Sequence, residues 1–193
     1  MLRRCFLALA AAMALPAAAA PDTELWQRLQ GGGHVLLMRH AATTPGIGDP
    51  PGFRLDVCST QRKLSEQGRR DAAVIGTAFR TRGIPLGPVW SSRWCRCLDT
   101  ARLAFGRVEQ APMIDSIFRD DEAASRAKVR ETLARIASWR QQGTKDNLVL
   151  VTHDVNIRAL VDEFVAQGEI VVARFEAGRL EVLGRLRAHG GDQ

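Results

Sequence analysis

Residues 34–40 of the chain read HVLLMRH, an apolar run that ends in an arginine and a histidine. A continuous apolar run of this length is typical of a strand that is buried on both faces, as in a parallel sheet covered by helices. A second such run, LVLVT at residues 148–152, is followed by His153 and Asp154. A third strand is predicted at residues 88–92, which read PVWSS. These runs decide the fold, because they supply the buried core of a sheet.

Helical patterns alternate with these strands along the chain. We predict helices at residues 23–30, 65–82, 94–105, from Asp120 or Asp121 to 140, and at 155–165. A further strand is predicted near residues 108–114, a long loop at 43–63, and a hairpin of residues 169–175 and 179–186 that turns at 176–178. The alternation predicts an α/β class, as a three-layer α/β/α sandwich around a mostly parallel sheet. Residues 20–193 are expected to form one domain.

Length and composition agree with an ordinary globular domain. The chain has 193 residues, of which 46% are hydrophobic and 25% charged, and its net charge is +6. These values exclude a disordered chain, a collagen and a coiled coil. The moderate positive charge leaves a nucleic-acid partner open but weakly supported at this point.

The first residues predict a signal peptide over residues 1–19. Arg3 and Arg4 precede an apolar run at residues 5–15, and small residues follow it up to Ala19, after which cleavage is expected. The mature chain is therefore expected to be periplasmic or secreted, with no stable membrane anchor. Its 25 basic and 21 acidic residues give a net charge of +4. In that compartment we predict no nucleic-acid partner.

Export changes the interpretation of the cysteines, because disulfides persist in oxidising compartments. The mature chain has three: Cys58, Cys95 and Cys97. One disulfide from Cys58 to either of the others would leave one thiol free, and three unpaired thiols are an equal alternative.

Polar residues follow each of the three main strands. Arg39 and His40 follow the apolar residues of the strand at 34–38, two serines end the strand at 88–92 with Arg96 soon after, and His153 follows the strand at 148–152. In parallel α/β sheets the binding crevice lies at the carboxyl ends of the strands. Arginines and helix N-termini at that edge favour a phosphoryl group. An imidazole there can attack phosphorus while guanidiniums neutralise the transition state, so no metal or other cofactor is expected.

Four motifs in order along the chain resemble the histidine phosphatase superfamily, which has the phosphoglycerate-mutase-like fold. They are MRHAAT at residues 38–43, LSEQGRRDA at 64–72, SSRWCRCLDTA at 91–101 and VLVTH at 149–153. The resemblance implies that His40 is the nucleophile, with Arg39, Arg96 and His153 as the catalytic phosphate pocket and Thr43 as a substrate-binding neighbour. The family glycine after the histidine is an alanine here.

Three further residues are assigned no catalytic role. Arg93 matches no family position and is expected to be solvated. His34 lies at the other end of its strand and His189 in a polar tail, so both are expected to be structural or solvent-facing.

The proton donor has two candidate sources. One branch of the superfamily uses an aspartate directly after the second histidine, which is Asp154 here, and we favour it. The other branch uses a glutamate from an earlier segment, where this chain has Asp120, Asp121 and Glu122. An equally weighted alternative for Asp154 is that it only caps the following helix.

The resemblance implies a metal-independent phosphomonoesterase that forms a phosphohistidine on His40 and hydrolyses a phosphorylated small molecule or sugar. A phosphomutase is an alternative within the class, and a non-catalytic protein that binds phosphate or an anionic sugar is one outside it. Cys58 before Gln61 and Arg62, with GEIVV at residues 168–172, also resembles periplasmic lipopolysaccharide-core heptose-phosphate phosphatases. The 43–63 loop is expected to rim the pocket and to set the substrate.

Overall fold

A six-stranded sheet forms the centre of the computed structural model, which describes residues 22–187. The predicted signal peptide and His189 lie outside these residues. The strand order is β3-β2-β4-β1-β5-β6. The strands are β1 (Val35–Arg39), β2 (Leu86–Ser91), β3 (Glu109–Gln110), β4 (Asn147–Thr152), β5 (Ile170–Glu176) and β6 (Arg179–Leu186).

Most of the sheet is parallel, as predicted. β4 lies between β1 and β2 and is parallel to both, and β3 extends the sheet parallel to β2. The hairpin of β5 and β6 is antiparallel and pairs with the other side of β1. It turns at Ala177 and Gly178, both of which have positive φ angles.

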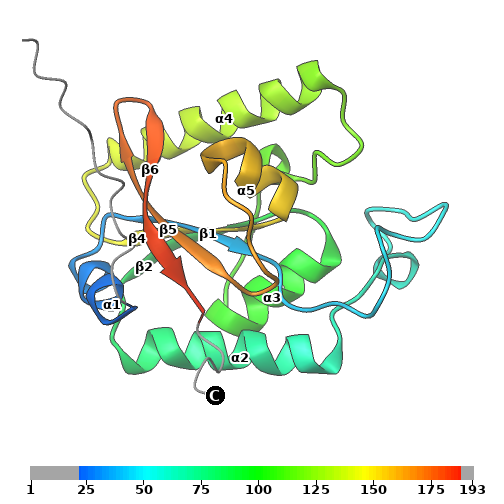
Figure 1. Ribbon diagram of the computed structural model, residues 1–193, viewed down its shortest axis with the longest axis horizontal. Helices are drawn as coiled ribbons and strands as arrows, with labels where there is room; N and C mark the ends of the chain where they lie inside the picture. Colours follow the sequence, from blue (N-terminus) through cyan, green and yellow to red (C-terminus); the bar gives the residue numbers. More distant parts are fainter. Residues whose placement is uncertain (1–21, 188–193) are drawn as a thin grey trace, which may run out of the picture.

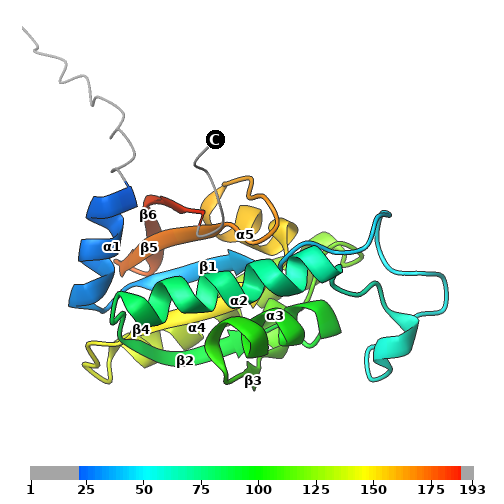
Figure 2. The ribbon, with the colours of Figure 1, turned by 90° about the horizontal axis from the view of Figure 1, so that it is seen from below.

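Five helices cover the two faces of the sheet (Figures 1 and 2). They are α1 (Asp22–Gly31), α2 (Glu66–Thr81), α3 (Cys95–Phe105), α4 (Glu122–Arg140) and α5 (Asp154–Val161). One core cluster packs α1, α2 and α3 against Leu36 and Val149, while a second packs α4 and α5 against Leu37 and Leu150. Successive strand residues thus face opposite helical layers, which explains why the apolar runs are continuous. The three-layer α/β/α prediction is confirmed.

Two predicted elements were wrong in extent. The strand expected near residues 108–114 is only the two-residue β3, and a short 3₁₀ helix follows at Pro112–Ile114. Proline has no backbone N–H for a sheet and its fixed φ suits a helical turn, so the strand ends before it. Helix α5 ends at Val161 rather than at residue 165, because Asp162 adopts a left-handed conformation with φ of 55°.

The 43–63 loop extends beyond the carboxyl edge of the sheet (Figure 2). It contains one 3₁₀ turn, Cys58–Thr60. A disulfide joins Cys58 to Cys95, the first residue of α3, with 5.6 Å between their Cα atoms. Cys97 is free and buried, and burial raises the pKa of its thiol to about 12. The pairing left open by the sequence is therefore Cys58 with Cys95.

None of the helices within residues 22–187 has the length and apolar character needed to cross a membrane.

Candidate active site

The carboxyl ends of β1, β2 and β4 meet at one edge of the sheet. In the register Arg39 pairs with Thr152. The next residue, His40, donates its backbone N–H to the Thr152 carbonyl at 3.0 Å. As a result, the rings of His40 and His153 lie edge to face with centroids 5.5 Å apart. The structure thus brings together two histidines that are more than a hundred residues apart in the sequence.

His40 is buried, with one ring nitrogen committed to the backbone. Nδ1 lies 2.9 Å from the carbonyl oxygen of Ala41. A carbonyl can only accept, so Nδ1 carries the proton and Nε2 keeps a free lone pair. Burial lowers the pKa of His40 to about 3, with the charges of Arg96 and Arg39 acting in the same direction against the Ala41 hydrogen bond. The ring is therefore neutral at physiological pH, which is the form that a nucleophile requires.

His153 is held by contacts on both ring nitrogens. Arg96 Nη2 lies 3.5 Å from Nδ1 and Ser92 Oγ lies 3.0 Å from Nε2. Since a guanidinium can only donate, the proton lies on Nε2, from which it donates to Ser92. Burial holds the pKa of His153 well below its ordinary value, and the neighbouring His40, Arg96 and Arg39 lower it further. The second imidazole is therefore also neutral in the unliganded site.

Arg96 forms a buried ion pair with Asp49 of the 43–63 loop. Its Nη1 lies 2.8 Å from Asp49 Oδ1, and the two side chains are 5% and 7% exposed. Asp49 also accepts from Trp94 Nε1 at 2.9 Å and from the backbone N–H of Arg62 at 3.0 Å. Burial opposes ionisation of Asp49, but Arg96 and these donors hold its pKa below the ordinary value. The carboxylate therefore occupies one side of the guanidinium that the sequence assigned to phosphate.

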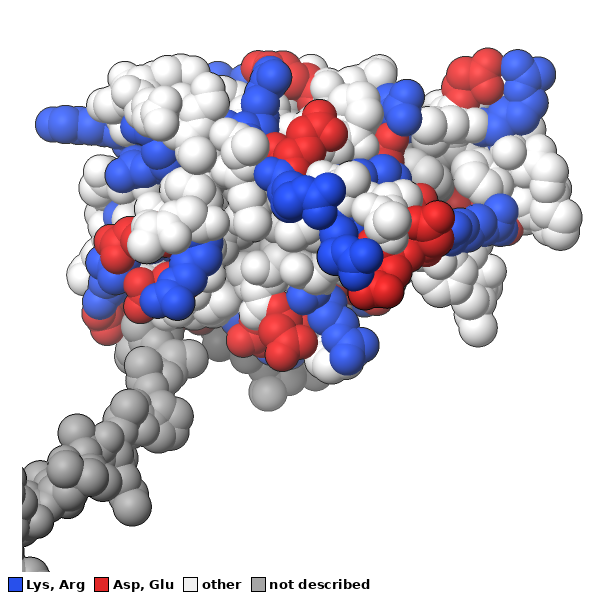
Figure 3. All heavy atoms as spheres, turned by 90° about the horizontal axis from the view of Figure 1, so that it is seen from above, with Lys and Arg blue, Asp and Glu red and all other residues white. Residues whose placement is uncertain are grey.

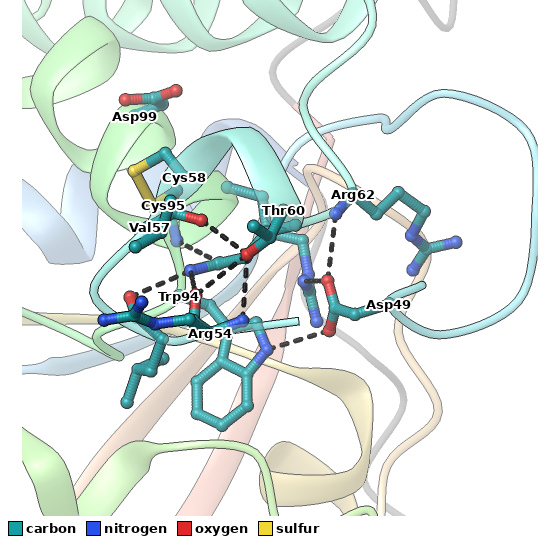
Figure 4. Close-up of a disulfide and its surroundings, with 12 residues drawn as sticks. Asp49, Arg54, Val57, Cys58, Thr60, Arg62, Trp94, Cys95 and Asp99 are labelled. Atoms are coloured by element: carbon teal, nitrogen blue, oxygen red, sulfur yellow. Dashed lines mark hydrogen bonds and ion pairs between the residues drawn. A yellow bond between two sulfur atoms is a disulfide. The ribbon is translucent and has the colours of Figure 1, made fainter. Parts of the chain in front are cut away.

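Asp49 was missed by the sequence analysis, and Gln61 was named there only beside Cys58 in a resemblance, without a role in the site. Gln61 is buried: its Oε1 accepts from the backbone N–H of Cys95 at 3.0 Å, and its Nε2 donates to the carbonyl oxygens of Arg54 and Leu55. The Cys58–Cys95 disulfide lies beside these contacts (Figure 4). The loop is thus tied to the start of α3 by a covalent bond and by hydrogen bonds. Among these residues, the sequence indicated a possible contact only for the cysteines.

Arg39 and Asp154 also line the cavity. Arg39 Nη1 donates to the carbonyl of Val165 at 2.8 Å, and its Nη2 lies 3.9 Å from Asp154 Oδ1. The N-cap position of α5 is His153, so Asp154 is the first helical residue and does not cap the helix. Its side chain is 45% exposed and lines the cavity. The capping alternative for Asp154 is therefore wrong.

The alternative donors separate into one that reaches the cavity and two that do not. Asp120 lines the cavity and pairs with Lys128 at 2.7 Å. Asp121 caps α4 by accepting from the backbone N–H of Ala124 at 2.8 Å, and the exposed Glu122 pairs with Arg126. Neither Asp121 nor Glu122 lines the cavity. Asp120 is thus the only one of the three whose carboxylate faces the site.

Two further residues singled out in the sequence have positions to report. Thr43, expected to bind substrate, lies outside the cavity lining, and its Oγ1 accepts from Gln167 Nε2 at 3.1 Å. Arg93 is 43% exposed, as expected for a solvated residue, but it also lines the cavity and donates through Nε and Nη2 to the buried Asp115 at 2.7 and 2.6 Å. Asp115 also accepts from Ser92 Oγ at 3.3 Å, so this pair supports the residue that contacts His153.

The backbone after His40 packs closely against the start of α2, which explains the glycine in the motif at residues 64–72. The carbonyl of Ala42 accepts from the backbone N–H of Ser65 at 2.9 Å, and a Cβ added at Gly68 would lie 2.0 Å from the same oxygen. Only glycine allows α2 to approach the loop this closely. On the other side, the backbone N–H of Gly168 lies 3.1 Å from the His40 carbonyl.

The cavity above these groups has a volume of about 490 Å³. Its walls are the 43–63 loop, the segment at residues 115–120 and the first residues of α3 and α5. Across residues 22–187, no group of three or more His, Cys, Asp or Glu side chains is arranged to hold a metal ion. The site therefore offers neutral imidazoles, guanidiniums and, as candidate proton donors, the carboxylates of Asp154 and Asp120, a set suited to an anionic ester.

The chain resembles known proteins in part of its sequence and in its fold. Residues 35–120 match the family model of the histidine phosphatase superfamily, branch 1. No curated protein matches the chain in sequence. The structure of the protein histidine phosphatase SixA complexed with tungstate is similar at 12% identity and a TM-score of 0.59, covering 80% of this chain and 97% of that one.

Two other solved structures are similar to the same degree. Phosphoserine phosphatase from Entamoeba histolytica, in complex with 3-phosphoglyceric acid, is 14% identical with a TM-score of 0.59, covering 79% of this chain and 95% of that one. The alpha-ribazole phosphatase from Shigella flexneri is 18% identical with a TM-score of 0.58, covering 83% of this chain and 100% of that one. At these identities the likeness is one of fold.

Proposed function

Because residues 35–120 match the family model of the histidine phosphatase superfamily, we propose that the chain is a phosphatase that hydrolyses phosphate monoesters through a phosphohistidine on His40. The observation that carries the proposal is the state of the His40 ring. Its Nδ1 is committed to the Ala41 carbonyl and its Nε2 is free, inside a cavity lined by Arg39, Arg96 and His153.

In the first step, Nε2 of His40 attacks phosphorus and the bond to the ester oxygen breaks. The imidazole becomes a phosphorylated cation that still carries the proton on Nδ1. The Ala41 carbonyl at 2.9 Å accepts that proton in a hydrogen bond and so stabilises the positive charge.

The guanidiniums of Arg39 and Arg96 stabilise the negative charge on the phosphoryl oxygens. Arg39 is held by the Val165 carbonyl and Arg96 by Asp49, so both are positioned before the substrate arrives. Donors fixed in this way cost no reorganisation in the transition state. The neutral His153 completes the phosphoryl pocket beside Arg96.

A carboxylic acid must protonate the leaving alkoxide and then accept a proton from the attacking water. We assign this role to Asp154, whose side chain lines the cavity and lies 3.9 Å from Arg39. Water then breaks the bond between phosphorus and Nε2, which releases phosphate and returns His40 to its neutral form. Asp120, which pairs with Lys128, is the second candidate.

We further propose that the enzyme is exported and acts in the periplasm or outside the cell on a phosphorylated small molecule or sugar. The Cys58–Cys95 disulfide supports this compartment, because such bonds persist in oxidising surroundings. Basic and acidic side chains are interspersed over the face drawn in Figure 3, which favours a small substrate over a nucleic acid. The narrower likeness to lipopolysaccharide-core heptose-phosphate phosphatases stays a prediction.

Turnover of p-nitrophenyl phosphate tests the proposal. The wild-type protein should hydrolyse this ester, His40→Ala should abolish the activity, and EDTA should leave it intact. His34→Ala is a matched control, because His34 lies just before the other end of β1 and outside the cavity. Full activity of His40→Ala would contradict the proposed nucleophile, and loss of activity in EDTA would contradict metal independence.

A further inference from the structure

The cavity is larger than a phosphoryl group requires. Its volume of about 490 Å³ lies in the range of pockets that enclose whole small-molecule ligands. The groups assigned to the phosphoryl group, including His40 and His153, occupy its inner end at the edge of the sheet. The outer part lies between the 43–63 loop and the segment at residues 115–120. That part is available to the rest of the substrate.

The charges that line the cavity do not cancel. Six side chains are cationic and four are carboxylates. Four of the cations pair with the four carboxylates, as Arg96 with Asp49, Arg93 with Asp115, Lys128 with Asp120 and Arg39 with Asp154. Arg62 and Arg119 remain without a carboxylate within 4.0 Å in the part of the chain that the structure describes. Among residues 22–187, the lining of the cavity therefore has two more cations than carboxylates.

The two arginines lie at different depths. Arg62 is partly buried and donates through Nη1 to the Gly46 carbonyl. Burial lowers its pKa, as do the positive charges of Arg96 and Arg39, two residues of the phosphoryl pocket. Arg119 is exposed and stacks on the ring of Phe53, with its Cζ 5.2 Å from the ring centroid. The unpaired charge of the outer part is therefore that of Arg119.

Aromatic side chains connect the phosphoryl end to Arg119. The ring of Trp94 lies 5.4 Å from that of His153, and the ring of Phe53 lies 5.9 Å from that of Trp94. Arg119 then covers Phe53. Aromatic faces of this kind bind the apolar face of a ring, and a stacked guanidinium still directs its N–H groups sideways to an anion. The aromatic side chains of Trp94 and Phe53 thus form a surface for a substrate ring between the phosphoryl end of the cavity and the guanidinium of Arg119.

We propose that the outer part of the cavity is a second anion subsite, in which Arg119 binds an anionic group on the leaving group of the substrate. The substrate class that fits is a phosphate monoester of a ring, such as a sugar, that carries a second phosphate or a carboxylate. The inference rests on the proposed function only for the position of the first phosphate.

Binding by the His40→Ala protein tests this subsite without turnover. Isothermal titration calorimetry compares fructose 6-phosphate with fructose 1,6-bisphosphate as probes. The bisphosphate should bind about tenfold more tightly, since a charge-assisted contact exceeds the roughly twofold gain that two equivalent phosphates give by statistics alone. Adding Arg119→Gln should reduce the ratio of the two dissociation constants to about twofold. Adding Arg130→Gln instead should leave the ratio unchanged, because Arg130 is exposed on α4 away from the cavity.

A ratio near two in the His40→Ala protein, a ratio that Arg119→Gln does not change, or no measurable binding of either probe would overturn the subsite. A different result would contradict the proposed function, namely no turnover of p-nitrophenyl phosphate by the wild-type protein. The binding ratio is measured on a variant without the nucleophile, so either result can occur without the other.

Discussion

Replacing Asp49 by Asn removes the charge from a buried ion pair while keeping the size of the side chain. Asp49 and Arg96 are 7% and 5% exposed, and their atoms lie 2.8 Å apart. Removing one partner of a buried pair costs about 3–5 kcal/mol, because it leaves the other charge without a counterion. Asn can still accept from Trp94 or from the Arg62 backbone, so we expect a loss of about 3 kcal/mol. For a chain of this length, that loss lowers the melting temperature by about 6–12 °C.

The same change should make the protein more responsive to phosphate. In the wild-type protein Asp49 already neutralises Arg96, whereas in Asp49→Asn a bound phosphate supplies the missing negative charge. Thermal denaturation with and without inorganic phosphate measures both effects. Asp56→Asn is the matched control in the same loop, since Asp56 is 70% exposed in its pair with Arg54 and its replacement should leave the melting temperature close to that of the wild-type protein.

Two results would refute this account of Asp49. One is a melting temperature of Asp49→Asn within the range of the Asp56→Asn control. The other is an equal stabilisation of the wild-type protein and Asp49→Asn by phosphate, which would mean that the carboxylate does not balance the charge of Arg96.

Three further predictions concern the histidines, one glycine and the proton donor. Between about pH 7 and pH 5 the free energy of unfolding should fall by about 2 kcal/mol through His40 alone, because the unfolded ring binds a proton near pH 6.5 while the folded pKa is about 3. The lowered pKa of His153 adds to this loss, and urea denaturation of His40→Ala should show a shallower pH dependence. Gly68→Ala places a Cβ 2.0 Å from the Ala42 carbonyl oxygen, so it should cost more than about 2 kcal/mol and reduce turnover, and an unchanged melting temperature would contradict the close packing. Asp154→Asn should slow hydrolysis of alkyl phosphates about a hundredfold or more but affect p-nitrophenyl phosphate less, and equal losses on both esters would place the proton donor elsewhere.

The sheet and the convergence of the two histidines were predictable from the sequence. Continuous apolar runs at residues 34–38 and 148–152 identified buried parallel strands. The residues that follow such strands must lie at one edge of the sheet, so His40 and His153 were expected to meet. The disulfide partner of Cys58 was not predictable, because Cys95 and Cys97 are two residues apart and differ only in which side of α3 they occupy.

The wall formed by the 43–63 loop was beyond what the sequence could indicate. Asp49 and Phe53 lie in a segment without hydrophobic periodicity, so no local pattern assigns their side chains to a face. Their partners Arg96 and Arg119 are 47 and 66 residues away along the chain. Such contacts depend on how the loop folds over the sheet edge, and the sequence predicted only that a long loop rims the pocket. The predicted lengths of β3 and α5 were wrong for a local reason, because Pro112 and the left-handed Asp162 end these elements early.

The phosphorylation state of His40 during turnover tests the central claim most directly. The protein is mixed with a radiolabelled phosphate monoester, quenched in base and analysed for label that is stable in base and released by acid. We expect one such phosphoryl group per chain, located on His40 and absent from His40→Ala. Turnover by the wild-type protein without any trapped label, or label that persists in His40→Ala, would contradict a phosphohistidine intermediate on His40.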